Sequence, residues 1–233
     1  ESVPTLKTMT QGAINVLDEN ANGFFLMVEG GAVDWAGHGN TTARMIEEEI
    51  DFNRAVEAAV EWVQANSNWD ETLIIVTADH ETGYLTGPGS GTDGAKEGSG
   101  TAVFTEPENN GAGMLPDTDW HSGDHTNHLV PLFANGIGSD LLVQHADEYD
   151  IKLGAYLTNS EVGQTLKTLW PDPDDSFTPP KNIVLMISDG CGANQIMAAN
   201  FYQYGEANAQ AYQQWPAQYF MSTYMALDYT GDH

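Results

Sequence analysis

Three largely apolar runs of strand length each end abruptly in polar or acidic residues, and this pattern constrains the fold more than any other feature. The runs are Phe24–Val28, Thr72–Thr77 and Lys181–Ile187. Such runs are typical of strands buried on both faces of a parallel sheet. We therefore expect three strands of one sheet, and we expect the residues that follow each strand to lie at the carboxyl edge of that sheet. A further strand is expected at 129–134, where Pro131 indicates an edge strand or a strand terminus.

Segments with the spacing of amphipathic helices alternate with these strands. Apolar residues recur at helical intervals in 5–17 and 41–66, a helix is expected within 153–170, and another is expected after Gly192. The acidic run Glu47–Glu49 is expected to lie largely on the solvated side of its helix. Alternating strands and helices predict an α/β layered fold, with a largely parallel central sheet flanked by helices.

The length of 233 residues suits one domain that is interrupted by irregular stretches. Residues 1–170 and 181–233 are expected to be two parts of this domain. Residues 84–120 are rich in Gly, Pro, Asn, Asp and Ser, which predicts a loop excursion at the surface. The Pro/Asp-rich stretch 171–180 cannot join a helix or a sheet interior, and it is expected to be a tail or linker.

The charge balance is strongly acidic, with 34 Asp and Glu residues against 7 Lys and Arg residues and a formal net charge of -27. Such a charge repels nucleic acids and anionic membrane surfaces, so we expect neither as a partner. Solubility and a halophilic adaptation to high salt explain the surplus equally well. No apolar run approaches the roughly 20 residues that span a bilayer, and the single cysteine, Cys191, can form no intrachain disulfide.

Residues able to bind metals follow each of the three principal strands. Glu29 ends the first run, Asp79 and His80 follow the second, and Asp189 follows the third. Ligands of open α/β sheets bind outside the carboxyl ends of the strands, so these side chains indicate a shared site. A mixture of carboxylates and imidazoles suits zinc, whereas a set of oxygen ligands suits magnesium.

Two further segments add candidate ligands. Asp34 and His38 follow Glu29 in a glycine-rich stretch, which we expect to be a tight turn around an ion. His121, His125 and His128 lie close together before an apolar run. For any one of these three taken alone, a surface or structural histidine is the better interpretation.

Four segments resemble the metal-site motifs of the alkaline phosphatase family. They are Val-Glu-Gly-Gly-Ala-Val-Asp-Trp-Ala-Gly-His at 28–38, Thr-Ala-Asp-His-Glu-Thr-Gly at 77–83, His-Thr at 125–126 and Met-Ile-Ser-Asp-Gly at 186–190. The resemblance implies an alkaline-phosphatase-like fold and the hydrolysis of phosphate monoesters with two Zn²⁺ ions and one Mg²⁺ ion.

The family pattern also implies a role for each matching residue. It assigns Asp34, His38 and His125 to a first zinc, Asp79, His80 and Asp189 to a second zinc, and Glu29 with Asp189 to the magnesium. Trp35 stands where members of the family vary and where the side chain faces the phosphate pocket, so it is a candidate substrate-binding residue. Ordinary core packing explains Trp35 equally well.

The resemblance breaks down in three respects. No segment matches the family's serine nucleophile, and neither Arg44 nor Arg54 matches its phosphate-binding arginine. The order of motifs is also different, because the Ser-Asp-Gly strand precedes the other metal motifs in the family. The chain therefore reads as the family's C-terminal part, 1–170, followed by its N-terminal part, 181–233, in a permuted, split or incomplete order.

The leading hypothesis is a phosphate monoester hydrolase that acts through a phosphoserine intermediate on a serine outside these residues. One alternative is a catalytically silent metal-binding fragment or half of a split protein. Another is a related di-zinc phosphodiesterase or sulfatase-type hydrolase, against which Glu29 as a third-metal ligand argues. The resemblance further implies a homodimer with a periplasmic or secreted location.

Overall fold

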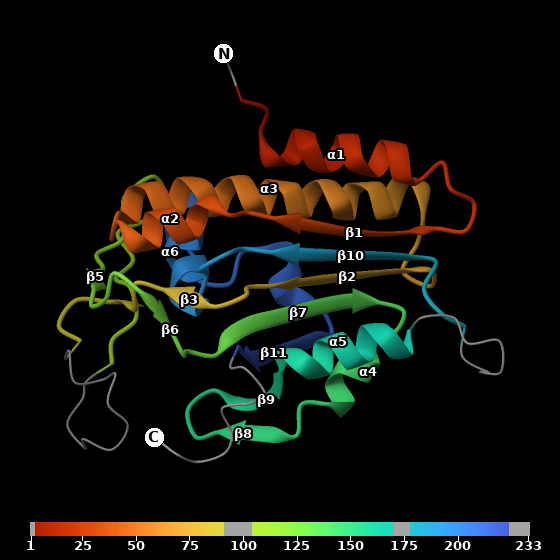
Figure 1. Cartoon of the computed structure of the whole chain (residues 1–233). Helices are drawn as coiled ribbons and strands as arrows, with labels where there is room; N and C mark the ends of the chain where they lie inside the picture. The colour runs from red at the N-terminus through yellow and green to blue at the C-terminus, as the bar shows by residue number, and fades with distance from the viewer. Residues whose placement is uncertain (1–2, 91–103, 170–177, 224–233) are drawn as a thin grey trace.

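One mixed sheet of seven strands forms the centre of this chain in a computed structural model that describes residues 3–90, 104–169 and 178–223 (Figure 1). Its strands are β1 (Phe24–Glu29), β2 (Thr72–Thr77), β7 (Val130–Gly136), β8 (Glu148–Asp150), β9 (Gly154–Thr158), β10 (Asn182–Ile187) and β11 (Ala217–Ser222), in the order β1-β10-β2-β7-β11-β9-β8. Two small ladders pair β3 (Glu81–Thr82) with β6 (His125–Thr126) and β4 (Leu85–Thr86) with β5 (Asp119–Trp120).

The sheet joins three parallel strands, β1, β10 and β2, to a part that contains both antiparallel and parallel pairs. Strand β10 lies between β1 and β2 and pairs with both in parallel, so the segments on either side of 171–180 share one sheet. Strand β7 is antiparallel to both β2 and β11. The predicted α/β fold is confirmed, and the sheet is mixed rather than largely parallel. Residues 171–177 of the predicted linker and residues 91–103 of the predicted loop excursion lie outside the described residues.

Burial differs among the strands that the sequence predicts. All six residues of β2 are buried, as expected for a central strand with covered faces. Strand β1 does not fit this expectation, because Phe25 and Met27 are about half exposed and β1 lies at the edge of the sheet. Pro131 lies near the start of β7, which is an interior strand and not an edge.

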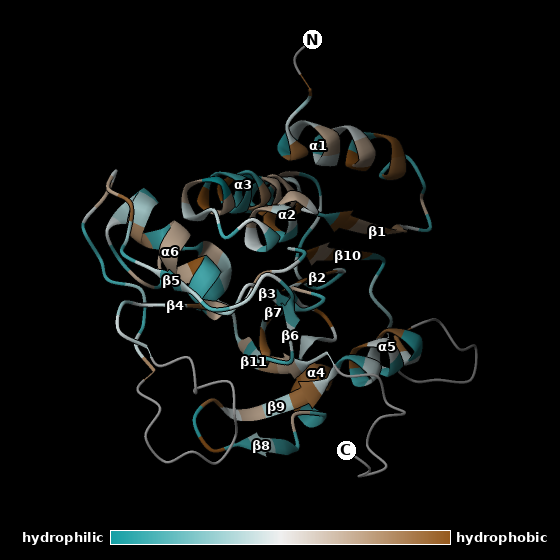
Figure 2. Ribbon diagram, turned by 60° about the vertical axis from the view of Figure 1, so that its left-hand side comes forward, coloured by the Kyte–Doolittle hydropathy of each residue, from teal (hydrophilic) through white to brown (hydrophobic). Residues whose placement is uncertain are grey.

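Helices cover both sides of the strands. They are α1 (Leu6–Leu17), α2 (Ala32–His38), α3 (Thr42–Asn66), α4 (Ser139–Gln144), α5 (Asn159–Thr168) and α6 (Ala193–Tyr204), with the 3-10 helix η2 (Ala211–Gln214). Helix α3 packs against α1, α2 and α6, whereas α4 and α5 pack against each other and against β7, β9 and β11. Figure 2 shows α6 and α5 on opposite sides of the strands. No helix among the described residues combines the length and apolar character needed to cross a bilayer.

Helix α3 differs from its predicted orientation at one residue. Glu47 is exposed and pairs with Arg44, as expected for a solvated face. Glu49, by contrast, is fully buried with no exposed surface, on the same stripe as Met45 and Phe52. A stripe of residues at intervals of three and four faces the core of a helix, and position 49 falls on it. The prediction that the whole acidic run is solvated is therefore wrong for Glu49.

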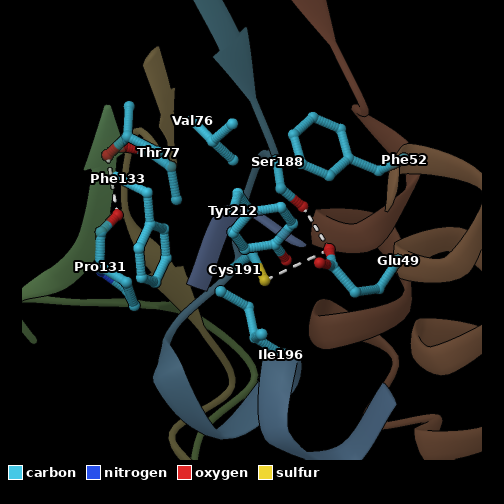
Figure 3. A pocket seen from close by; sticks show the side chains of 11 residues that line it. Glu49, Phe52, Val76, Thr77, Pro131, Phe133, Ser188, Cys191, Ile196 and Tyr212 are labelled. Atoms are coloured by element: carbon cyan, nitrogen blue, oxygen red, sulfur yellow. Dashed lines mark hydrogen bonds between the residues drawn. The ribbon is translucent and has the colours of Figure 1, made fainter. Parts of the chain in front are cut away.

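The Glu49 carboxylate lies in a polar cluster inside the core (Figure 3). Its Oε2 accepts hydrogen bonds from the Ser188 hydroxyl at 2.6 Å and from the Cys191 thiol at 3.4 Å. Burial raises the pKa of Glu49 to about 7, although these two hydrogen bonds act in the opposite direction. The ionised form of a buried carboxyl is disfavoured because it loses its hydration.

This burial predicts a specific dependence of stability on pH for the metal-free protein. The carboxyl takes up a proton more readily in the folded state, so its contribution to stability is full below about pH 4.5 and is lost as pH rises through about 7. Between about pH 5 and pH 8, the free energy of unfolding of the wild type should fall relative to that of Glu49→Gln by about 2–3 kcal/mol.

Urea denaturation of both proteins across this pH range measures the difference. Glu47→Gln is the matched control, because it removes a charge from a solvated side chain of the same helix. A wild-type minus Glu49→Gln difference that stays constant with pH would contradict the assignment of a buried, ionisable Glu49.

Candidate metal centre

The parallel strands end level with one another, and this brings the candidate ligands together. Glu29 of β1 is in register with Ile187 of β10, which is in register with Thr77 of β2. Hydrogen bonds continue past the strand ends, from Gly30 N to Ile187 O at 2.8 Å and from Ser188 N to Thr77 O at 2.9 Å. The residues after each strand therefore start from the same edge.

Asp34 and His38 reach this edge from a short helix rather than from the expected turn. They lie four residues apart in α2, so both side chains point from the same side of the helix. The His38 Nε2 atom lies 3.4 Å from Asp34 Oδ2. Asp34 is buried, whereas His38 is exposed.

His125 comes from a distant part of the chain and is placed by a small ladder. Strands β3 and β6 pair so that His125 lies opposite Thr82, two residues after the predicted ligand His80. The ring of His125 stacks on that of His80 at a centroid distance of 3.6 Å. Its Nε2 atom lies 3.1 Å from His38 Nε2 and 3.5 Å from Asp34 Oδ1.

At this edge of the sheet, two groups of three ligand atoms lie close enough to hold ions. One consists of Asp79, His80 and Asp189, which is the set that the family pattern implies for the second zinc. The other consists of Asp34, His80 and His125, so His80 borders both groups. His38 was predicted with Asp34 and His125, and its Nε2 lies within 3.4 Å of both residues without belonging to the compact group.

Glu29 lies beside Asp189 on the outer side of the centre. A side-chain carbon added at Gly31 would lie 3.6 Å from Glu29 Oε1 and 4.0 Å from Asp189 Oδ2, so both carboxylates face the same point of backbone. The charge of Glu29 is among those that raise the pKa of Asp189. Glu29 and Asp189 are thus neighbours, as a shared magnesium would require.

The remaining histidines of the cluster before β7 have other contacts. His121 Nε2 lies 2.8 Å from the Thr86 hydroxyl, and its ring contacts Tyr84. His128 packs edge-on against Tyr84, and burial lowers the pKa of His128. Among the described residues, neither His121 nor His128 belongs to a ligand group.

Hydrogen bonds orient the imidazoles so that a nitrogen lone pair faces the centre. His38 Nδ1 lies 2.6 Å from the carbonyl of Gly123, to which only a protonated nitrogen can donate. Thr82 Oγ1 donates to Asp34 Oδ1 at 2.6 Å and lies 3.2 Å from His80 Nδ1. Both arrangements leave Nε2 available as a ligand, and such outer contacts commonly fix metal-binding histidines.

Glu81 ties together the segments that carry these ligands, and sequence reasoning gave it no role. Its buried carboxylate accepts hydrogen bonds from Tyr84 N, Leu85 N, the Thr126 hydroxyl and the Gln195 amide. Thr126 directly follows the ligand candidate His125. The signal was available, because Glu81 and Thr82 complete the Asp-His-Glu-Thr motif, but the motif alone does not separate ligands from the residues that hold them.

The electrostatics of the centre fit a cation. Burial and the nearby carboxylates of Asp79, Asp34 and Glu29 raise the pKa of Asp189 to about 7. Asp189 Oδ1 is buried and has no hydrogen-bond partner among the described residues. Carboxylates held this close repel one another unless positive charge lies between them. The residues present therefore fit divalent metal ions in both charge and ligand type.

Trp35 lies next to Asp34 on α2 and is 76% exposed. The alternative that Trp35 is a core residue is therefore wrong. Arg44 is exposed on α3 and pairs with Glu47 and Glu48.

Comparisons with known proteins give a consistent result. Residues 1–106 match the sequence profile of the family described as alkaline phosphatase. Alkaline phosphatase 4 of Bacillus subtilis is 48% identical over 83 residues, which are 36% of this chain and 17% of that protein. Alkaline phosphatase of Escherichia coli is 32% identical over 155 residues, which are 65% of this chain and 31% of that protein.

A solved structure of a TAB5 alkaline phosphatase mutant with magnesium bound is also similar. It shares 31% sequence identity at a TM-score of 0.42, over 58% of this chain and 38% of that chain. In the matches to these relatives, the chain spans between about a sixth and two fifths of their length.

The geometry predicts which histidines bind zinc. Replacing His125 with alanine should lower the affinity for Zn²⁺ by at least about tenfold, because an imidazole that faces two other candidate ligands is lost. His121→Ala is the matched control, since it removes an imidazole of the same segment that bonds to Thr86 instead. Competition with a chromophoric chelator measures both affinities. Equal losses in the two variants would contradict the site.

Proposed function

Because this chain belongs to the alkaline phosphatase family over part of the length of its relatives, we propose that it forms the metal centre of a phosphate monoester hydrolase. The proposal assigns hydrolysis through a phosphoserine intermediate, with the serine and the phosphate-binding arginine supplied by residues outside these 233. The substrates are small phosphate monoesters, and neither nucleic acid nor membrane is a partner.

The observation that supports this function best is the convergence of carboxylates and imidazoles from separate segments. Asp34 comes from α2, His80 follows β2, His125 comes from β6 and Asp189 follows β10. Their ligand atoms fall into two groups in which all atoms lie within 4.8 Å of one another. Adjacent groups of this composition suit two divalent ions that together hold a phosphoryl group.

The ligand assignment follows the family pattern. Asp34, His38 and His125 would hold the first zinc, Asp79, His80 and Asp189 the second, and Glu29 with Asp189 the magnesium. Such ions, when bound, stabilise negative charge on the phosphoryl oxygens and lower the pKa of bound water. Glu29 favours monoesters over diesters or sulfates, because it supplies an oxygen ligand for a third metal site.

The chain's own residues orient this machinery and hold it against repulsion. The Thr82 hydroxyl connects Asp34 to His80, so the two ligand groups share one hydrogen-bonded support. Glu81 holds the His125 segment through Thr126. A strongly acidic protein can still bind an anionic ester here, because the local charge at a metal centre is set by its ions.

We propose the same family architecture for the whole protein. Residues 1–170 correspond to the family's C-terminal part and 181–233 to its N-terminal part, with 171–180 as the connecting segment. The pairing of β10 between β1 and β2 supports this proposal, because it combines both parts in one sheet. A homodimer, a periplasmic or secreted location and an acidic surface adapted to salt complete the proposal.

Three substrates that share the same leaving group, para-nitrophenol, test the activity. We expect the whole protein, including the residues that supply the serine and the arginine, to hydrolyse para-nitrophenyl phosphate faster than bis(para-nitrophenyl) phosphate or para-nitrophenyl sulfate when it is loaded with Zn²⁺ and Mg²⁺. A chelator should abolish this hydrolysis, and added Zn²⁺ should restore it. Asp34→Asn is the control for contaminating phosphatases, because it removes a candidate ligand.

Two results would count against the proposal in different ways. Hydrolysis that persists in the chelator and in Asp34→Asn would contradict a metal-dependent centre built from these residues. Tight Zn²⁺ binding without any hydrolysis, by a polypeptide whose intact mass matches 25.3 kDa, would favour the metal-binding fragment.

Trp35 provides a separate test of substrate binding. Because its side chain is 76% exposed beside Asp34, Trp35→Ala should change the free energy of unfolding by less than about 0.5 kcal/mol. The same variant should weaken the binding of inorganic phosphate to the zinc-loaded protein by about three- to tenfold, through loss of one hydrogen-bond donor. Tyr149→Ala is the matched control, because Tyr149 is 75% exposed on β8. Calorimetric titration measures the phosphate affinity of both variants. Equal phosphate affinities of Trp35→Ala and Tyr149→Ala would show that Trp35 does not bind the substrate.

A further inference from the structure

The turn that carries Asp189 is bonded on its inner side to a buried acid that belongs to no ligand group. Glu49 of α3 accepts hydrogen bonds from Ser188 Oγ at 2.6 Å and from Cys191 Sγ at 3.4 Å (Figure 3). These two residues lie directly before Asp189 and directly after Gly190. One carboxylate oxygen, Oε2, thus contacts both ends of a four-residue turn.

The turn is also closed by its own backbone. Cys191 N donates to Ser188 O at 3.2 Å, and Ser188 N donates to Thr77 O on the neighbouring strand. Gly190 has a φ of 77°, which favours glycine, and a side chain there would meet the Asp34 Cα atom at 2.7 Å. The turn therefore lies closely against α2 and has little freedom to move outward.

The outer side of the turn faces the other carboxylates of the candidate metal centre. Gly190 N donates to Asp79 Oδ1 at 3.2 Å, while the Asp189 carboxylate lies among those of Asp79, Asp34 and Glu29. When these carboxylates are ionised they repel one another, so the position of Asp189 depends on restraints from the rest of the turn. The hydrogen bonds to Glu49 provide such a restraint, because they hold Ser188 and Cys191 on either side of Asp189 and Gly190.

Two simpler explanations of Glu49 are weaker. The cavity beside it has a volume of about 10 Å³, room for one water molecule at most, so it holds no substrate. As a filler of the core, a carboxylate is a poor choice, because its burial costs free energy that an apolar side chain of similar size avoids. A buried acid at this position therefore calls for a contact that only an acceptor can make.

We propose that Glu49 is a positioning residue, which holds the 188–191 turn so that Asp189 stays between the second zinc site and the magnesium site. The part of this inference that concerns metal rests on the proposed function. The part that concerns the turn rests on the hydrogen bonds alone. Glu49 acts through Ser188 and Cys191 and touches no metal, substrate or reacting atom.

Substitutions of Glu49 that separate volume from hydrogen bonding test this role. Glu49→Leu keeps the bulk but removes both acceptor oxygens, whereas Glu49→Gln keeps one carbonyl acceptor for Ser188. Ser188→Ala removes the main donor from the other end. Val63→Ala is the matched control for lost packing, since Val63 is also fully buried on α3, about 20 Å away along the helix.

Two measurements are made on each full-length variant. The first is amide hydrogen exchange of Gly190 and Cys191 in the metal-free protein at about pH 8, and the second is the affinity for Co²⁺, read from its visible absorption. In Glu49→Leu and Ser188→Ala, exchange should be about tenfold faster and Co²⁺ affinity about tenfold lower. Glu49→Gln should stay within about twofold of the wild type in both. The double variant Glu49→Leu/Ser188→Ala should lose no more Co²⁺ affinity than the more affected of the two single variants, because both substitutions break the same hydrogen bond.

Glu49→Leu should also be at least as stable as the wild type at this pH, because it removes a buried charge. A purely structural role predicts the reverse, with affinity falling only as far as stability falls, as in Val63→Ala. Unchanged exchange in both Glu49→Leu and Ser188→Ala would overturn the proposal. If the wild type binds no Co²⁺ but exchange is faster in the variants, the proposed metal centre fails while Glu49 still holds the turn.

Discussion

The parallel pairing of β10 between β1 and β2 is the constraint on which the rest of the structure depends. It joins residues from opposite ends of the chain in one ladder, with Glu29, Ile187 and Thr77 at the same level. Every candidate ligand is then placed relative to that edge, directly after a strand, on the adjoining helix α2 or across the β3–β6 ladder. A shift of β10 by one residue would turn its alternate side chains to the other face and separate Asp189 from Asp79.

Sequence reasoning predicted the features that are encoded locally. The three strands and the acids that end them could be identified because an apolar run and its polar terminus lie within a few residues. Spacing alone could not select His125 from His121 and His128, and only the family resemblance did, since that choice is made by the pairing of β6 with β3, about 45 residues earlier in the chain. Strand β11 was missed for the same reason, because its pairing with β7 and β9 depends on tertiary structure.

Glu49 was misjudged for a different reason. Three consecutive glutamates suggest a solvated face, and this composition was given more weight than the helical period. Yet Met45, Glu49, Phe52 and Asn53 recur at intervals of three and four, and all four are buried. The helical period therefore predicts the burial of position 49 correctly, although glutamate is an unusual residue type at a buried position. Such disagreement between pattern and residue type is expected where a buried polar group has a specific partner.

Two acids with raised pKa values, Asp189 and Glu49, lie on opposite sides of one short turn. The repulsion around Asp189 is relieved by binding a cation, whereas the burial of Glu49 is offset within the protein by hydrogen bonds from Ser188 and Cys191. The repulsion around Asp189 and the burial of Glu49 are therefore coupled through the backbone of the turn. An outward movement of Asp189 would break the contacts of Glu49 and leave a buried carboxylate unpaired, which is more costly than never having buried it. The core of α3 thereby makes the displacement of Asp189 unfavourable even before a metal ion binds.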